Sequence, residues 1–404
     1  MNTATMPFEA RTTELLAELE ASGQLKHLQM IGSPMDAEIR LRQPDGSFKD
    51  ALCFCSNNYL GLANHPEVVE AGIQGLRDFG AGTASVRFIC GTFTPHETLE
   101  QTIADYMGTE ASYTFVSCWT ASEALFPTCC EAGDIIVSDA LNHACIIDSM
   151  RLTPVIKRGV HKAVYQHSDM DDLRAKLQAA KDNPDVSGQI WVVTDGVFSM
   201  EGDIADLPAM RALCDEFGAM LVVDDSHGHG VMGLTGRGTH EHYDMLGQID
   251  AFTGTLGKAL GGGAGGFIAS SRKLIDLITQ RGRPTLFSNA LPATVACSAN
   301  KAIEIVRREP ERVAKLRTNV ATARAKIKDA GFDVLESPTA ICPIIIGDTA
   351  EAIRMSGRLL ELGVFVIGFG YPVVPEGTAR LRIQMSAAHT DEHIETLVEA
   401  LQKL

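Results

Sequence analysis

The sequence predicts an α/β protein with a mainly parallel large-domain sheet and a smaller α+β C-terminal domain. From residue 66 onward, helical stretches alternate with short apolar strands, the pattern of a parallel sheet covered by helices on both faces. After residue 292, a long helical stretch leads into further strands. The chain has 404 residues and 45% hydrophobic content, enough for two cores. We therefore predict an N-terminal arm with a hairpin (1–57), a large domain (58–292) and a small domain (293–404).

The N-terminal arm is expected to begin with an amphipathic helix that ends at Gly23. Its apolar residues fall on one helical stripe, namely Phe8, Leu15, Leu16 and Leu19. Alternation at 37–42, a turn at 44–47 and an apolar return at 51–55 predict a hairpin.

Apolar runs and helical periodicity place the later elements. The large domain is expected to have helices that include 66–79, 96–107 and 169–182, and strands near 112–116, 134–138, 188–194, 219–224, 251–255 and 266–270. The small domain is expected to have a helical stretch over 293–330 that breaks near Pro310, strands near 332–335, 341–346 and 380–385, and helices near 350–362 and 390–403.

Composition excludes several classes of protein. No apolar run approaches a membrane span, and the first residues lack a basic-then-apolar signal, so we expect a cytoplasmic protein without a membrane span. The ten cysteines form no CxxC pair and mostly lie in apolar segments, which predicts reduced core thiols and neither disulfides nor a metal site. A net charge of −16 argues against nucleic acid as a partner.

One lysine lies on a glycine-rich connection between two predicted strands. The segment 253–266 contains Lys258 and seven glycines. An amine displayed in this way can form a Schiff base with a carbonyl, most readily when its surroundings lower its pKa. A surface lysine on a glycine turn is the alternative.

The predicted strand at 219–224, earlier in the chain than this loop, ends in a group of reactive side chains. Asp224, Asp225, Ser226 and His227 follow the apolar run 220–223. Ligand-facing residues of α/β sheets cluster at the carboxyl ends of strands. The order acid, histidine, lysine is that of pyridoxal-phosphate enzymes of the aminotransferase type, in which the acid keeps the pyridine nitrogen protonated.

Eight segments extend this similarity along most of the chain. They are 56–66, 84–92, 138–144, 194–200, 223–227, 253–262, 286–289 and 382–390. In this order they resemble the α-oxoamine synthases, pyridoxal 5'-phosphate enzymes with the aminotransferase-like fold called fold type I.

The resemblance implies a C-acyltransferase that condenses glycine with acetyl-CoA to give 2-amino-3-oxobutanoate and coenzyme A. A decarboxylating relative that joins alanine or serine to a different acyl-CoA remains open. The resemblance also implies a homodimer with active sites shared at the interface. Coenzyme A is a polyanion, so basic residues should gather at its entrance, with Arg151, Lys157 and Arg158 as candidates.

The resemblance assigns the chemistry to a few side chains. Lys258 would hold the cofactor and then act as the base that removes the Cα proton. Asp224 would pair with the pyridinium nitrogen and His227 would reach the ring hydroxyl, although a turn acid and a loop histidine are the structural alternatives. His143 would stack on the pyridine face. Ser199 would lie beside the ring hydroxyl, or would be an ordinary turn serine.

The phosphate is expected to bind at a helix start, where amides and the helix dipole favour an anion. The resemblance implies Cys118 and Trp119, through their backbone amides, together with Thr255. Core packing is the alternative for the first two. Ser288 matches a position that reaches the phosphate from the neighbouring subunit.

The amino-acid carboxylate calls for a bidentate partner, and a guanidinium supplies two donors in a fixed fork. Arg382 matches the arginine of the family, with Asn58 as a second donor and Ser85 also assigned to the substrate. Because Arg380 lies two residues away on the same strand face, it is the competing assignment.

Three departures from the family bear on substrate preference: Gly228-His229 after the strand-end histidine, the helix start 117–122, and Gly82-Thr83. Two rival interpretations are weaker. Residues 228–233 satisfy GxGxxG, which would suggest a dinucleotide-binding oxidoreductase, but glycines follow where a helix should open. His240 and His242 lack a third metal ligand. A catalytically silent subunit is disfavoured because Lys258, Asp224 and His143 are all present.

Overall fold

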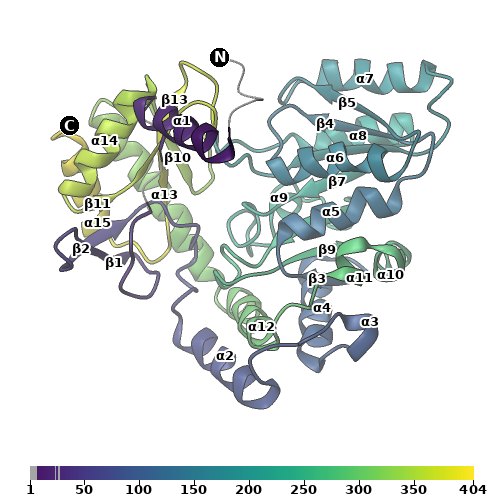
Figure 1. Ribbon diagram of the computed structural model, residues 1–404, viewed down its shortest axis with the longest axis horizontal. Helices are drawn as coiled ribbons and strands as arrows, with labels where there is room; N and C mark the ends of the chain where they lie inside the picture. The colour runs from purple at the N-terminus through teal and green to yellow at the C-terminus, as the bar shows by residue number, and fades with distance from the viewer. Residues whose placement is uncertain (1–6, 23, 26–27) are drawn as a thin grey trace.

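The computed structural model describes residues 7–22, 24–25 and 28–404, which form two lobes (Figure 1). The first helix, α1, spans Phe8–Ala21. Its predicted end at Gly23, like the first six residues, lies outside the described part of the chain. The apolar stripe of α1 is exposed in the single chain, at 71% for Phe8 and 52% for Leu15.

The large lobe contains a seven-stranded sheet in the order β3-β9-β8-β7-β6-β4-β5. Its strands are β3 (Ala111–Phe115), β4 (Ile135–Asp139), β5 (His161–Tyr165), β6 (Ile190–Asp195), β7 (Met220–Asp224), β8 (Ala251–Thr255) and β9 (Gly266–Ser270). Strand β9 runs antiparallel to both of its neighbours, and the other pairs are parallel. The predicted mainly parallel sheet is confirmed.

Helices cover both faces of this sheet because its central strands are apolar on both sides. Successive residues of β6 enter different apolar clusters: Val192 belongs to the cluster that includes Leu177 of α7 (Met170–Asp182), and Val193 to the one that includes Leu125 of α5 (Cys118–Cys129). The other helices of this lobe are α2 (Pro66–Phe79), α3 (Arg87–Cys90), α4 (Thr94–Met107), α6 (Ala144–Ile156), α8 (Leu207–Phe217), α9 (Thr239–His242), α10 (Arg272–Arg281) and α11 (Arg283–Phe287).

Strand β5 is an edge strand that the sequence analysis missed. Its burial alternates and only its last residue, Tyr165, is buried, so it has no continuous apolar run. The GxGxxG segment 228–233 forms turns and bends, and the next helix, α9, begins only at Thr239 and has four residues. This geometry contradicts the dinucleotide-binding interpretation, in which the motif opens a helix.

The smaller lobe combines C-terminal and N-terminal segments. Its two sheets are β10-β13-β12 and β1-β2-β11. The strands are β1 (Glu38–Arg42), β2 (Phe48–Cys53), β10 (Ile341–Gly347), β11 (Val364–Phe365), β12 (Ile367–Phe369) and β13 (Ala379–Gln384). Because β2 pairs in parallel with β11, the N-terminal hairpin lies beside the C-terminal elements (Figure 1).

The predicted helical stretch over 293–330 is two helices, with the break at Glu309 as expected. They are α12 (Ala293–Arg308) and α13 (Pro310–Asp329), and α14 (Thr349–Glu361) and α15 (Asp391–Leu401) follow. The strand expected near 332–335 was wrong, since only an isolated bridge between Val334 and Ile344 forms there. No helix among the described residues is long and apolar enough to cross a bilayer.

Candidate active site

Lys258 lies on the connection between β8 and β9, as the sequence predicted. The two strands pair directly from Thr255 to Gly266, so the loop leaves and re-enters the sheet at one place. Burial lowers the pKa of the Lys258 ammonium, the positive charge of Arg382 adds to this effect, and the carboxylate of Asp224 opposes it. A lysine with a lowered pKa is a better nucleophile and base near neutral pH.

Two buried carboxylates lie side by side at the carboxyl ends of parallel strands. Asp195 ends β6 and pairs in register with Asp224, which ends β7 and pairs with Thr253 of β8. Burial raises the pKa of Asp195 well above its usual value, and the neighbouring charge of Asp224 adds to the shift. Both effects favour the protonated form of Asp195.

Asp224 faces the cavity and Asp225 faces away from it. The Oδ2 atom of Asp224 accepts from the thiol of Cys118 at 3.4 Å, and Oδ1 accepts from the backbone N–H of Ser226 at 3.0 Å. The Oδ2 atom of Asp225 instead accepts from the backbone N–H of Thr239 at 2.7 Å, and burial raises the pKa of Asp225 to about 8.

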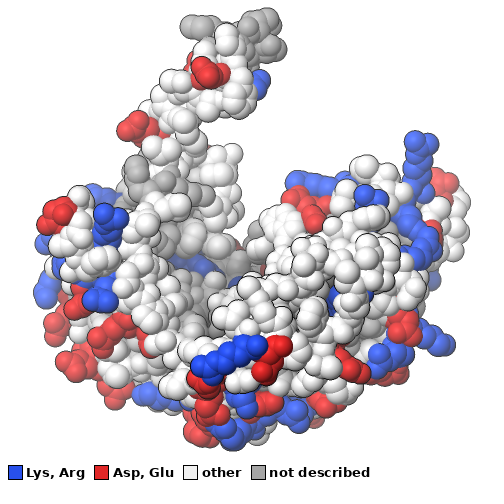
Figure 2. All heavy atoms as spheres, turned by 60° about the horizontal axis from the view of Figure 1, so that its bottom comes forward, with Lys and Arg blue, Asp and Glu red and all other residues white. Residues whose placement is uncertain are grey.

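These groups line a cavity of about 230 Å³. Its walls are Cys118, Trp119, His143, Cys145, Asp195, Val197, Asp224, Ser226, His227, Thr255 and Lys258. The space-filling view is hollowed between the two lobes, and charges of both signs are mixed over that face (Figure 2). Seven predicted site residues therefore meet in one place: Cys118, Trp119, His143, Asp224, His227, Thr255 and Lys258.

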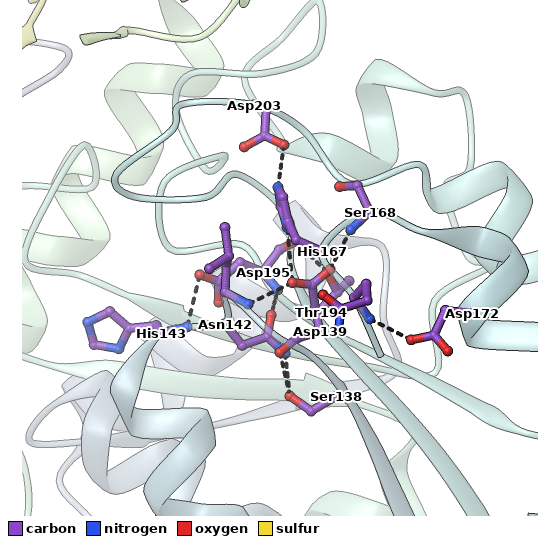
Figure 3. A network of polar contacts seen from close by, with 12 residues as sticks. Ser138, Asp139, Asn142, His143, His167, Ser168, Asp172, Thr194, Asp195 and Asp203 are labelled. Atoms are coloured by element: carbon purple, nitrogen blue, oxygen red, sulfur yellow. Dashed lines mark hydrogen bonds and ion pairs between the residues drawn. The ribbon is translucent and has the colours of Figure 1, made fainter. Parts of the chain in front are cut away.

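A polar network holds His143 at the cavity wall (Figure 3). Its backbone N–H donates to Oδ2 of Asp195 at 3.2 Å, and the Asp195 N–H donates to Oδ1 of Asn142 at 2.7 Å. On the ring, Nδ1 lies 3.0 Å from the Cys145 thiol, a hydrogen bond that raises the pKa of His143. The imidazole packs edge to face against Trp119, with centroids 6.3 Å apart.

The same network continues to an imidazole between two carboxylates (Figure 3). His167 Nδ1 lies 3.0 Å from Asp139 Oδ1, and Nε2 lies 2.9 Å from Asp203 Oδ2. Burial alone would lower the pKa of His167, but the two carboxylates outweigh it and raise the pKa to about 10. Asp139 also accepts from the Leu141 N–H at 2.8 Å, so the cationic imidazole braces the turn that leads to His143.

The start of α5 approaches the glycine-rich loop very closely. Ser117 caps this helix, accepting from the Thr120 N–H at 3.2 Å. A methyl group on Gly266 would overlap the backbone nitrogen of Cys118. Only a glycine at the start of β9 lets the helix N-terminus face the cavity, where its free amides favour an anion such as phosphate.

Arg382 and Arg380 share strand β13 but differ in what they bind. Arg380 donates to the carbonyl of Met200 at 2.9 Å and to Glu201 Oε1 at 3.1 Å. Arg382 is 6% exposed, and no described residue accepts a hydrogen bond from its Nε or NH2. Arg382 does not line the cavity itself, but a buried guanidinium with unpaired donors is suited to a ligand, and a carboxylate matches its fork.

The remaining predicted residues do not line this cavity. The Asn58 side chain accepts from the Ala63 N–H at 3.1 Å and donates to the Met35 carbonyl at 3.4 Å. Ser199 is half-buried two residues beyond Val197, and the Ser85 carbonyl accepts from the Ala290 N–H at 3.3 Å. Ser288 lines a separate hollow of about 10 Å³. The basic residues Arg151 and Lys157 pair with Asp148 and Glu131.

Sequence reasoning assigned no site role to four cavity residues: Cys145, Asp195, Val197 and Ser226, the last of which it named only as part of the strand-end group. Asp195 could have been found, because it ends a buried strand as Asp224 does. Cys145 carried no such signal.

Comparison with known proteins agrees with this geometry. The profile of aminotransferase class I and II matches residues 49–401. The 2-amino-3-ketobutyrate coenzyme A ligase of Escherichia coli strain K12 is 42% identical over 98% of this chain and 97% of its own length. The human mitochondrial ligase of that name is 43% identical over 95% and 89%. An 8-amino-7-oxononanoate synthase of Thermoanaerobacter pseudethanolicus is 41% identical over 97% and 95%.

Solved structures give the same answer for the fold. The serine palmitoyltransferase of Sphingomonas wittichii matches with a TM-score of 0.90 and 28% identity, over 98% of both chains. A structure described as SPT with a PLP internal aldimine also matches with a TM-score of 0.90, at 29% identity and 98% coverage of both. The chain belongs to the class I and II aminotransferase family. Within that family it is an α-oxoamine synthase, and the predicted fold type I architecture is confirmed.

The cavity residues fit pyridoxal 5'-phosphate, the cofactor of this family. Its aldehyde can react with the amine of lowered pKa, and its ring nitrogen can pair with the carboxylate at the end of β7. Its phosphate can bind at the N-terminus of α5, which a Cβ on Gly266 would overlap. These three features surround one cavity of about 230 Å³.

His167 should stabilise the fold in a pH-dependent way. Its folded pKa is raised from 6.5 to about 10, so the stabilisation is fully present below pH 6.5 and disappears as pH rises towards 10. Below pH 6.5 we expect His167→Gln to lower the free energy of unfolding by about 2 kcal/mol. The difference from the wild type should shrink as the pH rises towards 10. Denaturant titrations across this range measure it. His161→Gln, on β5, is the control, and a pH-independent deficit would contradict the ionic clamp.

Gly266→Ala should weaken pyridoxal phosphate binding. The added methyl displaces the start of α5, so we expect the dissociation constant to rise at least about tenfold. Gly263→Ala is the matched control, because its methyl would lie 3.5 Å from Val295 Cγ1, an ordinary contact. Titration of the cofactor-free protein, followed by absorbance, measures both. Equal affinities for the two variants would rule out the close approach as a determinant of binding.

Proposed function

We propose that this protein condenses glycine with acetyl-CoA to give 2-amino-3-oxobutanoate and coenzyme A, using pyridoxal phosphate. The observation that carries the proposal is the 42% identity, over 98% of the chain, to enzymes named 2-amino-3-ketobutyrate coenzyme A ligase. When bound, the cofactor supplies a pyridinium ring that stabilises negative charge at the substrate Cα.

The side chains around the cavity have separate tasks in this proposal. Lys258 would hold the cofactor through its Nζ and would take the Cα proton of the bound amino acid on that nitrogen. Its lowered pKa supports this role. Asp224 holds the proton of the pyridine nitrogen, because its carboxylate lines the cavity at the end of β7. His143, braced by Asp195, covers the ring face.

Arg382 binds the carboxylate of the amino acid. Its burial and unpaired donors support this choice over Arg380, whose guanidinium is already bound to Glu201 and to the backbone. Asn58 and Ser85 are further candidates for the substrate, and Ser199 for the ring hydroxyl. Cys118, Trp119 and Thr255 are proposed to bind the phosphate.

A homodimer with shared active sites also belongs to the proposal. The exposed apolar stripe of α1 and the 71% exposure of Phe287, next to Ser288, support a surface that is covered in the assembly. Ser288 would then reach the phosphate of the partner's site. A cytoplasmic location remains a prediction.

A second candidate is a decarboxylating synthase that uses alanine or serine with another acyl-CoA. The 41% identity to an 8-amino-7-oxononanoate synthase favours keeping it. The test records the absorbance of the purified protein with glycine, L-alanine, L-serine and L-threonine, then measures thiol release with a panel of acyl-CoAs. Glycine with acetyl-CoA should be turned over fastest. Carbon dioxide release with alanine or serine and a longer acyl-CoA would support the second candidate instead.

Arg382→Lys should raise the KM for glycine by roughly 10- to 100-fold, because an ammonium cannot donate two parallel bonds to a carboxylate. The KM for acetyl-CoA should stay unchanged. Arg317→Lys, on α13, is a control at an arginine that binds backbone carbonyls of residues 233 and 234. A larger effect on acetyl-CoA than on glycine would contradict the assignment.

Mixed dimers test whether Ser288 acts across the interface. A Lys258→Ala subunit paired with a Ser288→Asp subunit has one intact site if Ser288 acts in trans. Random pairing of the two inactive variants should therefore restore about a quarter of wild-type activity. No recovery, with heterodimers present by native mass spectrometry, would show that Ser288 acts within its own chain.

A further inference from the structure

A chain of buried hydrogen bonds ends on His227. The hydroxyl of Tyr59 lies 2.8 Å from His227 Nδ1 and 2.8 Å from Gln384 Oε1. The Gln384 Nε2 lies 2.8 Å from the backbone carbonyl oxygen of Cys55. Tyr59 and Gln384 are 1% and 2% exposed, so water does not compete for these contacts. The three side chains come from the segment after β2, the end of β13 and the turn after β7.

The backbone carbonyl fixes the direction of the first bond. A carbonyl oxygen only accepts, so the amide nitrogen of Gln384 must face Cys55. The opposite amide orientation would put two oxygens in contact. The oxygen Oε1 of Gln384 therefore faces Tyr59 as an acceptor.

The Tyr59 hydroxyl has one proton and two partners at 2.8 Å, while Asn57 Oδ1 lies farther away, at 3.3 Å. Because Oε1 of Gln384 only accepts, the hydroxyl must donate to it. The contact of 2.8 Å with His227 then needs a proton from the imidazole, so Nδ1–H of His227 donates to the tyrosine oxygen. The reverse arrangement would leave the Gln384 oxygen against a bare hydroxyl oxygen, a buried pair with no proton between them.

The imidazole has no second proton to offer. Burial lowers the pKa of His227 well below its usual value, and the positive charges of Lys258 and Arg382 add to this effect. A neutral imidazole with its proton on Nδ1 has a lone pair on Nε2. Since His227 lines the cavity and Nδ1 is occupied by Tyr59, Nε2 is the nitrogen available there.

We propose that Tyr59 and Gln384 are positioning residues that lock His227 in its Nδ1–H tautomer, so that Nε2 accepts a hydrogen bond from the group in the cavity. The locked tautomer stands on the contacts alone. The identity of the donor rests on the proposed function: it is the ring hydroxyl of the cofactor, to which His227 is then an acceptor and not a donor.

The relay also connects His227 to the carboxylate-binding strand. Gln384 lies two residues after Arg382 on β13, and alternate residues of a strand point to the same face. Strand β13 thus contributes both the unpaired guanidinium and the amide that sets the imidazole proton. A shift of this strand would disturb both groups together.

Gln384→Met separates the relay from simple packing. Methionine has a similar length but no acceptor, so the Tyr59 hydroxyl becomes free to donate to His227 Nδ1. The imidazole proton should then move to Nε2, while Tyr59 and His227 stay in place. The dissociation constant for pyridoxal phosphate should rise about tenfold, the cost of one misdirected buried hydrogen bond.

Nitrogen NMR of the full chain, labelled with ¹⁵N in its histidine rings and free of cofactor, reads the tautomer directly. The His227 signals are assigned by their loss in His227→Gln. We expect the Nδ1–H tautomer in the wild type and the Nε2–H tautomer in Gln384→Met. Tyr106→Phe is the control, because it removes another buried hydroxyl, one that donates to the Gly236 carbonyl, and should leave His227 unchanged.

An Nε2–H tautomer in the wild type would overturn the proposal, as would the same tautomer in wild type and Gln384→Met. The wild-type measurement decides the matter even if Gln384→Met does not fold. A locked Nδ1–H tautomer in a protein that does not turn over glycine and acetyl-CoA would reject the proposed function and leave the relay standing.

Discussion

The register of the parallel strands β6, β7 and β8 is the constraint on which the site depends. It places Asp195, Asp224 and Thr253 in one row at the edge of the sheet where Lys258 also emerges. If one strand slipped by one residue, its side chain in this row would point to the other face of the sheet, because side chains alternate between the two faces. The apolar residues of both faces therefore hold this row of side chains in position.

Burying several charged groups close together is electrostatically unfavourable, and the site responds with shifted pKa values. Adjacent buried carboxylates disfavour each other's ionised form, and burial together with the charge of Asp224 raises the pKa of Asp195. Lys258 and the buried Arg382 respond in the opposite sense, with lowered pKa values. The result is a cavity whose groups fit pyridoxal phosphate, with a second buried cation, Arg382, near it.

The turn at 198–203 joins the two lobes around this cavity. On one side Asp203 binds His167, and on the other Glu201 binds Arg380 of β13. The Gly202 carbonyl accepts from the hydroxyl of Thr339 at 2.7 Å. These bonds connect the strand that contains Arg382 to the network around His143.

Much of this protein could be predicted from sequence patterns. Apolar runs placed six of the seven strands of the large sheet, helical periodicity placed helices such as α2 and α7, and the proline at 310 marked the break between α12 and α13. Local patterns suffice there because a buried strand has an apolar run and an amphipathic helix has apolar residues at helical spacing. The exposed edge strand β5 and the bridge at Val334 lie where that signal is weak.

Some residues of the candidate site could also be predicted from the sequence, and others could not. Asp224, His227 and Lys258 stand out in the sequence because each follows a buried strand. Only the tertiary structure distinguished Arg382 from Arg380, since the two share a strand face and differ solely in the partners that the other lobe brings to them. Likewise, only the tertiary structure showed that Tyr59 and Gln384 form hydrogen bonds around His227. Hydrogen bonds between segments hundreds of residues apart leave no local periodicity, so folding alone determines which polar groups are paired and which stay free to bind a substrate.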